Sequence, residues 1–471
     1  MRQREKHFSR REKVQGQFLT PYEVASFIVN FVCINSEKVL GIDPSCGDGV
    51  FLKALAEAKF RDIIGIDVDQ EMLNKLPSEL KDQTKALCGE GLQPLALYEG
   101  AANAVVGNPP FSAKYGRVND PAILSNFELG RGRNSQAIEI LFLERFLQLA
   151  SSKGIIGIIL PHGIFSSLPL KYVRTFIMNK ASVLGIISLP RRIFSNGTTS
   201  KTCILFAQKE RTTRKTFMGI AKYLEDLPVL LEAYTQRQEL ESPPAFSVEL
   251  SSDTFIPEFY WSRKTAKCSF KDGLPIARLG DLLYEMRCGG AEYAEKRRFV
   301  ERGIPFVSAK TVTPLGLDLS RNERYIEPDS DMDKKWAYVK PGDIVFVRVG
   351  VGCSGRAAVV LADLEKGIAD DWIYIIRAKG ISPFYLSLFL QSKLGQHQIE
   401  PLKRGVGTVT IPQKLLKEIL VPLPSNSFQQ TVEAGYKEVV RLRKAGCLTE
   451  AEEKFKLLLS SIETAVGIDE G

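Results

Sequence analysis

At 471 residues the chain is long enough for two or three domains with sizeable hydrophobic cores. Hydrophobic residues make up 44% and charged residues 25% of it, and the formal net charge of +8 permits a polyanionic partner without requiring one. The eight cysteines include no Cys-x-x-Cys pair and there are only three histidines, which argues against a disulfide framework and a structural zinc site.

Residues 1–16 form a strongly charged leader. No apolar core follows its basic residues, so we do not expect a signal peptide, and we interpret the leader as a solvated tail with phosphate contact as the alternative. No uninterrupted apolar stretch approaches the length that spans a membrane. We therefore expect a cytoplasmic protein without a membrane segment and without a metal centre.

The first predicted helix begins near position 20. Thr20 suits an N-cap and Pro21 suits the first helical position, where the missing N–H costs little. Apolar residues then recur at helical spacing at Val24, Phe27, Ile28, Phe31 and Val32.

A strand, a glycine-containing turn and a second strand follow. Lys38–Asp43 is a short apolar strand that runs into the turn Pro44–Leu52, where glycines allow a ligand to approach the backbone. Ile63–Asp67 is a second strand and ends in a carboxylate about 20 residues beyond the turn, where nucleotide-binding folds place the acid that binds ribose hydroxyls. The combination predicts nucleoside binding.

Two more predicted strands end in polar residues. The third unit, Thr84–Leu92, is a strand with the acid Glu90 at its end, and a fourth strand runs through Ala104–Gly107 into Asn108-Pro109-Pro110-Phe111. Acids and glycines thus fall repeatedly at the carboxyl ends of strands, where doubly wound sheets bind their ligands.

The Asn108–Phe111 stretch has the clearest chemical interpretation. Two consecutive prolines hold the backbone extended and remove two amide donors, which leaves the Asn108 side-chain oxygen and the Pro109 carbonyl as acceptors. Two acceptors that bind both hydrogens of a planar NH2 group would localise the nitrogen lone pair, and Phe111 could stack on the attached ring. An ordinary turn is the alternative.

The pattern continues through a polar loop, Ser112–Arg133, and a helix, Ala137–Leu149. Ile155–Leu160 and Leu184–Leu189 are predicted strands, and Lys201–Gln208 is expected to complete a hairpin at the edge of the sheet.

The second half changes character. Residues 211–262 are interpreted as linker and peripheral packing, and from Ile276 onward short strands alternate with Gly- and Pro-containing turns. Ser427–Ala465 is predicted helical, with an apolar stripe that must bury against its own domain or a second copy. The stripe comprises Val432, Tyr436, Val439, Val440, Leu457 and Leu458.

These segments resemble a known family. Asp43–Leu52 followed by Asn108–Phe111 is similar to the gamma-class DNA methyltransferases that act on adenine N6, in which a segment like Thr20-Pro21 comes first and the recognition region last. Ile187–Phe206 resembles the late motif of that family, and the helix and strand before it resemble modification subunits of Type I restriction systems. The resemblance covers about Gln17–Gln208.

The resemblance implies an α/β, Rossmann-like methyltransferase domain at 17–210 and S-adenosyl-L-methionine as methyl donor. Asp67 would bind its ribose and Glu90 its adenine edge, and the target base would be flipped between Phe111 and Phe194. Asp48 stands where the family usually has Ser or Thr, and Glu90-Gly91 where Asp and a bulky residue are commoner. The implied cofactor residues are Thr20, Pro21, Asp43, Pro44, Cys46, Gly47, Gly49, Asp67, Val68, Glu90 and Asn108.

Residues 263–426 resemble an α+β target-recognition domain of a Type I specificity subunit, and 427–471 its helical spacer. The sequence segments that carry this resemblance include Gly303–Phe306, Lys340–Asp343 and Ser382–Leu386. Basic residues in this region are candidates for phosphate or guanine contacts, each with a solvated charge as the alternative. They are Lys310, Arg348, Arg356, Lys403 and Arg404.

The leading hypothesis is therefore a sequence-specific adenine-N6 methyltransferase that acts on double-stranded DNA, in a restriction-modification or related system. A restriction endonuclease subunit or a second copy of the chain is a candidate partner. Transfer to cytosine N4, to an RNA base or to a protein glutamine amide stays open, as does a non-catalytic DNA-binding subunit. No Pro-Cys dipeptide occurs, which argues against a thiolate mechanism at cytosine C5.

Overall fold

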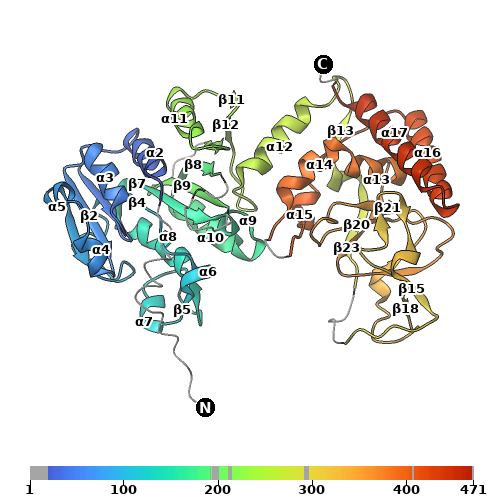
Figure 1. Ribbon diagram of the computed structural model, residues 1–471, viewed down its shortest axis with the longest axis horizontal. Helices are drawn as coiled ribbons and strands as arrows, with labels where there is room; N and C mark the ends of the chain where they lie inside the picture. The colour runs from blue at the N-terminus through green and yellow to red at the C-terminus, as the bar shows by residue number, and fades with distance from the viewer. Residues whose placement is uncertain are drawn as a thin grey trace, which may run out of the picture. The chain divides into compact units, whose positions relative to one another are not determined.

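The computed structural model describes residues 20–190, 193, 201–210, 215–290, 296–405 and 408–468. The chain divides into two compact units, Met1–Glu258 and Phe259–Gly471, coloured from blue to green and from green to red in Figure 1. The predicted leader at 1–16 lies outside the described residues. In the described ranges no helix is both long and apolar enough to cross a membrane, and no group of three or more His, Cys, Asp or Glu residues could hold a metal ion.

Unit 1 is built on a 10-stranded sheet within its described residues, with the order β11-β12-β10-β8-β9-β7-β4-β1-β2-β3. Its strands are β1 Leu40–Asp43, β2 Asp62–Asp67, β3 Lys85–Cys88, β4 Ala102–Gly107, β7 Ala150–Pro161, β8 Ser182–Ser188, β9 Thr202–Gln208, β10 Thr216–Ile220, β11 Leu240–Glu241 and β12 Pro244–Val248. Strands β3, β2, β1, β4 and β7 pair in parallel, which confirms the predicted doubly wound arrangement.

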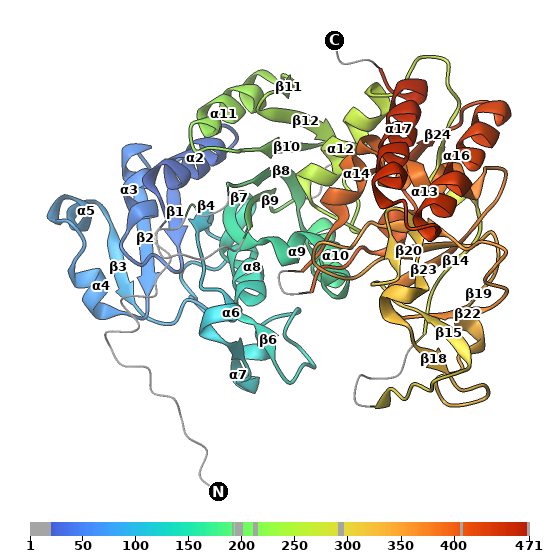
Figure 2. The same ribbon diagram turned by 45° about the vertical axis from the view of Figure 1, so that its right-hand side comes forward.

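The helices of unit 1 cover both faces of this sheet. They are α2 Tyr22–Cys33, α3 Val50–Glu57, α4 Gln70–Asn74, α5 Ser78–Gln83, α6 Ser112–Tyr115, α7 Pro121–Leu124, α8 Ile138–Leu149, α9 His162–Ser166, η1 Leu168–Leu170, α10 Lys171–Lys180 and α11 Asp226–Gln236; β5 Arg117–Val118 and β6 Gln136–Ala137 form a small separate ladder. Val106 packs in the core beneath α2, whereas a Cβ on the next residue, Gly107, would meet Phe146 of α8. Helices α2 and α8 therefore lie on opposite faces of β4, as Figures 1 and 2 show.

Two sequence expectations for unit 1 were wrong. Residues 211–262 are not a linker, because β10 pairs in parallel with β8 and β12 pairs with β10, which extends the central sheet. Strand β9 is not at an edge, because it lies antiparallel between β7 and β8. Apolar strands of this kind are buried on both faces, and sequence alone did not tell an interior strand from a hairpin arm.

Unit 2 is built from small sheets, as the alternating pattern predicted. The larger ones have the orders β14-β23-β20-β21 and β18-β15-β22-β19. The strands are β13 Ile276–Arg278, β14 Leu283–Cys288, β15 Ile304–Val307, β16 Val312–Thr313, β17 Gly316–Leu317, β18 Tyr325–Ile326, β19 Tyr338–Val339, β20 Ile344–Val347, β21 Ala357–Val359, β22 Gly367–Ala369, β23 Ile373–Ala378 and β24 Leu420–Pro422.

The described helices of unit 2 are α12 Pro257–Cys268, which begins at the unit boundary, η2 Leu279–Leu282, η4 Leu319–Asn322, η5 Lys335–Ala337, α13 Pro383–Gln391, α14 Lys393–Ile399, η6 Glu400–Leu402, α15 Gln413–Leu416, α16 Asn426–Lys444 and α17 Leu448–Val466. The C-terminal stretch predicted to be helical, Ser427–Ala465, forms two helices, α16 and α17, in unit 2. The Tyr436 hydroxyl accepts a hydrogen bond from the Val359 N–H at 2.9 Å, so the apolar stripe of α16 buries within unit 2. Leu457 of α17 stays exposed.

Candidate active site

The site lies where the order of the parallel strands reverses. Strand β1 lies between β2 and β4, so the loops after these strands diverge and leave a crevice at their carboxyl ends. A cavity of about 240 Å³ opens there. Its lining residues are Thr20, Pro44, Ser45, Cys46, Gly47, Asp48, Val50, Phe51, Asp67, Val68, Glu90, Gly91, Asn108, Pro109, Pro110, Tyr115, Ile138 and Phe142.

The turn after β1 forms the floor of the cavity. Gly47 and Gly49 have φ values of +49° and +82°, a region that L side chains rarely adopt. The Gly47 N–H donates to Asp67 Oδ2 at 2.8 Å, and the Cys46 N–H donates to the Ile66 carbonyl at 2.9 Å. The Cys46 side chain is buried, and this burial raises the pKa of its thiol, so it acts as a core residue rather than a nucleophile.

Asp43 is a buried carboxylate directly behind this turn. Its Oδ1 accepts a hydrogen bond from the Ser45 N–H at 2.9 Å, whereas its Oδ2 is buried without a hydrogen-bond partner. Burial, with a smaller contribution from Asp67, raises the pKa of Asp43 to about 8. A buried acceptor that lacks a partner is costly unless a ligand satisfies it.

Asn108 stands at the end of β4 with its amide fixed in one orientation. Its Nδ2 donates to the Thr20 hydroxyl at 3.1 Å, and its Oδ1 is buried without a hydrogen-bond partner. Thr20 is not the predicted N-cap, because α2 begins after Pro21 and has no side-chain cap. The Thr20 hydroxyl therefore orients the amide, and Asn108 keeps an unused acceptor at the cavity.

The structure does not test the base-stacking roles predicted for Phe111 and Phe194. The Phe111 side chain is 6% exposed, packs in the hydrophobic core of unit 1 and does not line the cavity. Phe194 lies outside the described residues. Their stacking on a target base stays a prediction. Pro109 and Pro110 do line the cavity, in agreement with their place in the loop.

The remaining predicted cofactor residues divide into two groups. Pro44, Cys46, Gly47, Asp67, Val68 and Glu90 line the cavity, whereas Pro21, Asp43 and Gly49 are not among its lining residues but are adjacent in sequence to residues that are. Both Asp67 oxygens accept backbone hydrogen bonds, from Gly47 and from Asp69, but each oxygen retains a second lone pair. Glu90 is exposed, and its carboxylate accepts a long hydrogen bond, 3.5 Å, from the Leu92 N–H.

Part of the cavity wall consists of residues that were not predicted from the sequence. Ile138 and Phe142 come from α8, and Tyr115 comes from α6, just after the Asn108 loop. Burial, and next the negative charge of Asp67, raise the pKa of the Tyr115 hydroxyl. Gly91 is also required, because a Cβ there would lie 2.0 Å from the Pro44 carbonyl oxygen. The glycine was visible in the sequence, but its contact joins two loops far apart in the chain.

The electrostatics of the cavity favour a cationic ligand that carries hydroxyl donors. Asp48, Asp67 and Glu90 line it, and the unpaired Oδ2 of Asp43 lies behind it, whereas the lining residues include no Lys or Arg. S-adenosylmethionine carries a sulfonium, an ammonium and two ribose hydroxyls. The residues present therefore fit the cofactor that the sequence implies.

The candidate DNA-binding residues lie in unit 2, and most have partners there. Arg404 is buried and its Nη1 donates to the Pro401 carbonyl at 2.6 Å, which contradicts its predicted contact with DNA. Arg348 donates to the Asp371 carbonyl at 2.8 Å, Arg356 to the Gly352 carbonyl at 3.1 Å, and Lys403 pairs with Glu400 at 2.5 Å. Lys310 is exposed.

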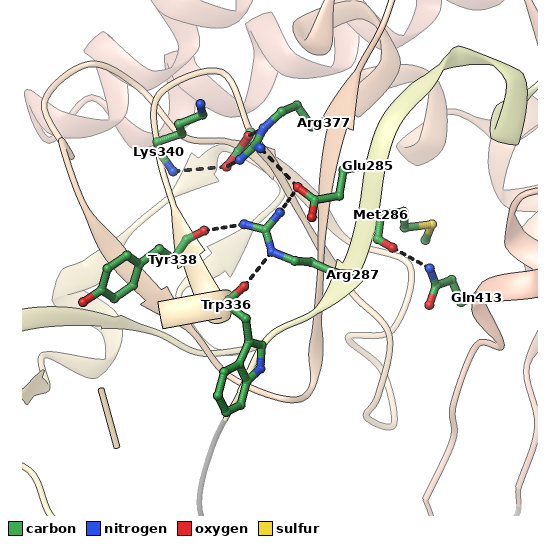
Figure 3. A network of polar contacts seen from close by, with 9 residues as sticks. Glu285, Met286, Arg287, Trp336, Tyr338, Lys340, Arg377 and Gln413 are labelled. Atoms are coloured by element: carbon green, nitrogen blue, oxygen red, sulfur yellow. Dashed lines mark hydrogen bonds and ion pairs between the residues drawn. The ribbon is translucent and has the colours of Figure 1, made fainter. Parts of the chain in front are cut away.

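A partly buried network of charged side chains involves one of the segments that resemble a recognition domain (Figure 3). In Lys340–Asp343, the Asp343 carboxylate accepts from Arg377 Nε at 2.8 Å and from its Nη2 at 3.0 Å. Glu285 accepts from Arg377 at 3.1 Å and also pairs with Arg287, which donates to two main-chain carbonyls. The segment Lys340–Asp343 therefore contributes to the internal ion pairing of unit 2.

Comparison with known proteins places the cavity in a matched segment. Residues 5–226 match the model of the N-6 DNA Methylase family. The chain is 24% identical over 250 residues to the Type I restriction enzyme EcoEI methylase subunit of Escherichia coli, which covers 46% of this chain and 49% of that protein. It is 21% identical over 288 residues to the Type II methyltransferase M.AccI of Acinetobacter calcoaceticus, which covers 59% and 52%. The chain thus spans about half the length of these curated relatives.

A solved structure is similar over more of the chain. The type IIG restriction endonuclease BpuSI gives a TM-score of 0.50 at 14% identity, over 94% of this chain and 65% of that chain, a likeness of fold alone. The predicted α/β fold followed by a further domain is confirmed. The segment that holds the cavity and the Asn108 loop is similar in sequence to N-6 DNA methylases, and unit 2 lies outside that match.

Proposed function

We propose that this chain is a sequence-specific methyltransferase that modifies N6 of adenine in duplex DNA, within a restriction-modification or related system. The observation that carries the proposal is the Asn108 Oδ1, a buried acceptor without a partner at the wall of an acid-lined cavity. The match of residues 5–226 to N-6 DNA methylases supports the same reaction.

The cavity residues have distinct tasks in this proposal. S-adenosylmethionine supplies an electrophilic methyl group on a positively charged sulfur. Gly47 and Gly49 allow its close approach to the backbone, and Asp43 provides a buried acceptor. Asp67 accepts from the ribose hydroxyls, and Val68 and Glu90 face the adenine.

Asn108 and Pro109 act on the target amine. An adenine amino group is a weak nucleophile because its lone pair is delocalised into the ring. The Asn108 Oδ1 and the Pro109 carbonyl each accept one N–H, which returns the lone pair to the nitrogen. The hydrogen bond to Thr20 keeps the amide from rotating its NH2 group toward the amine. The base reaches this position only when it is turned out of the duplex, and positioning then supplies most of the rate.

We propose that the protein belongs to the gamma class and that unit 2 reads the recognition sequence. Exposed Lys310 is the free candidate for a phosphate contact, whereas Arg348, Arg356 and Lys403 would have to exchange their present partners. A nuclease subunit or a second copy of the chain is the proposed partner. The α16 stripe is not the surface for that copy, because its valines and Tyr436 are buried within unit 2.

The alternatives share the acceptor pair and differ in substrate. Cytosine N4, an RNA base and a glutamine amide all present a planar NH2 group. The large second unit, Phe259–Gly471, favours a polymeric substrate that needs a separate reading domain. A non-catalytic DNA-binding subunit would retain the cavity without turnover.

Product analysis tests the proposal. Methyl-labelled cofactor is incubated with the chain and duplex DNA, RNA or a protein extract, and the products are hydrolysed and separated. We expect label in 6-methylaminopurine from duplex DNA alone. Label solely in pyrimidines, RNA or protein would reject the assignment, and no label in any substrate would favour the non-catalytic subunit. Mapping modified bases on a plasmid then gives the recognition sequence.

A further inference from the structure

The helix that follows the Asn108 loop is capped from another element. Helix α6 begins at Ser112, and its N-cap residue, Phe111, makes no side-chain cap. Instead Glu139 of α8 accepts the Ser112 N–H through Oε2 at 2.8 Å and the Ser112 hydroxyl through Oε1 at 2.9 Å. Both oxygens of the Glu139 carboxylate thus accept hydrogen bonds from Ser112, the residue that follows the Asn108–Phe111 loop.

The loop is therefore fixed at both ends. Before it, Gly107 pairs with Ile158 in the central sheet, and Thr20 holds the Asn108 amide. After it, Glu139 holds Ser112. Pro109 and Pro110 stiffen the backbone between these points, so the position of Ser112 decides the direction of the Pro109 carbonyl.

The same two helices also form a wall of the cofactor cavity. Ile138 and Phe142, on either side of Glu139 in α8, line the cavity, and so does Tyr115 at the end of α6. The Glu139–Ser112 contact joins these two helices. It thereby sets the acceptors and the cofactor wall at one fixed separation.

Glu139 makes this contact from a low-dielectric environment. Its side chain belongs to a residue that is 7% exposed. Hydrogen bonds to an ionised carboxylate are stronger than those between neutral groups, and burial protects them from competition by water. Without the carboxylate, the Ser112 N–H at the start of α6 loses its partner, and the loop keeps only its hydrogen bond at Asn108 and the packing of Phe111.

We propose that Glu139 is a positioning residue for methyl transfer: its grip on Ser112 fixes the Asn108 and Pro109 acceptors relative to the bound cofactor. This inference rests on the proposed function. Glu139 touches no reacting atom, so its effect falls on the rate of transfer more than on substrate affinity.

The chain offers a matched control in the same helix. Glu144 of α8 is 6% exposed and accepts the N–H groups of Glu128 and Leu129 at 2.7 and 2.8 Å. Like Glu139, it is a buried carboxylate that accepts hydrogen bonds from a loop, but the loop is a different one. Truncation of either residue removes a buried carboxylate and two hydrogen bonds, from one backbone N–H and one hydroxyl at Glu139 and from two backbone N–H groups at Glu144.

The experiment compares Glu139→Ala, Glu139→Gln and Glu144→Ala in the full chain. We expect Glu139→Ala to lower kcat about 100-fold, as a small misplacement of reacting groups does, with KM for DNA changed less than about threefold. Glu139→Gln should recover most of kcat, because its carbonyl can accept the Ser112 N–H and its NH2 can donate to the hydroxyl. Glu144→Ala should match Glu139→Ala in thermal stability yet keep kcat within about threefold of the wild type.

Hydrogen exchange at the Ser112 amide supplies a readout that needs no turnover. We expect faster exchange in Glu139→Ala, and wild-type exchange in Glu139→Gln and Glu144→Ala. Equal kcat losses in the two alanine variants, or unchanged kcat with a released Ser112 amide, would overturn the positioning role. If the wild type methylates no DNA, the proposed function fails, and the exchange data still decide whether Glu139 holds the loop.

Discussion

Asp43, behind the cavity of unit 1, and Asp343, in the ion network of unit 2, are both buried acids beside a strand, with opposite outcomes. In unit 1, Asn108 Oδ1 and Asp43 Oδ2 are buried and lack partners. In unit 2, both oxygens of Asp343 are satisfied by Arg377. Unsatisfied buried acceptors await a ligand, whereas a fully paired carboxylate is already used for stability. Buried side-chain oxygens without a partner also occur elsewhere, such as Thr410 Oγ1 in unit 2, so the unpaired Asn108 Oδ1 is informative because its residue lines the cavity.

The largest expected effect comes from Asn108→Ala. Loss of the Oδ1 acceptor should lower kcat by about 10³-fold, in the range seen when one preorganised polar group is removed from a transition state. Affinity for S-adenosylmethionine, measured by calorimetry, should change less than about threefold, because the turn and Asp67 remain. Asn30→Ala, at an exposed position of α2, is the control and should be silent. Retained transfer in Asn108→Ala would contradict the proposed chemistry.

Asp343→Ala should act on stability rather than on transfer chemistry. It leaves the Arg377 guanidinium without its bidentate partner, which we expect to lower the free energy of unfolding of unit 2 by about 3 kcal/mol. All 3 tryptophans of the chain lie in unit 2, so their fluorescence in a urea titration reports this unit.

Asp281→Ala is the control for that measurement. Asp281 pairs with Arg278 at 3.4 Å, but both side chains are more than half exposed, so the change should cost less than about 0.5 kcal/mol. Equal effects of the two variants would mean that the network of Figure 3 is not a principal support of unit 2.

Gly91→Ala should weaken cofactor binding. The added Cβ would lie 2.0 Å from the Pro44 carbonyl oxygen, so one of these two segments must shift. Both line the cavity, and we therefore expect about a tenfold higher Kd, or about 1.4 kcal/mol. Gly89→Ala is the matched control, because a Cβ there meets no atom within 4 Å. Calorimetry on both variants checks the expectation, and identical Kd values would show that the turn is not held by this contact.

The smallest expected effect is a pH dependence that Asp43 imparts. Its pKa is raised to about 8 by burial, so it is largely protonated at neutral pH in the free protein. A cationic ligand favours the ionised form and releases the proton on binding, so affinity should rise with pH and level off above about 8. The Kd ratio of Asp43→Asn to wild type should therefore grow from pH 6.5 to pH 8. The ratio cancels titration of the ligand's own amine, and a flat ratio would contradict the assignment.

The sequence determined much of unit 1. The strand ends at Asp43, Asp67 and Gly107 agree with their predicted positions, because short apolar runs that end in Gly, Asp or Asn leave few other choices. The Asn-Pro-Pro-Phe loop and its acceptors were also visible, since two prolines restrict the backbone through local sterics alone.

Only the tertiary structure determined the hydrogen-bond and ion-pair partners of these residues. Thr20 orients Asn108 across 88 positions, Glu139 holds Ser112 across 27, and Arg377 neutralises Asp343. It also decided that residues 216–248 extend the sheet and that Phe111 and Arg404 are buried. Local sequence sets backbone preferences within a few residues, whereas hydrogen-bond satisfaction and burial depend on contacts between distant segments. Short sequence motifs therefore predict the chemistry of the site, whereas the contacts that position its residues form only when the chain folds.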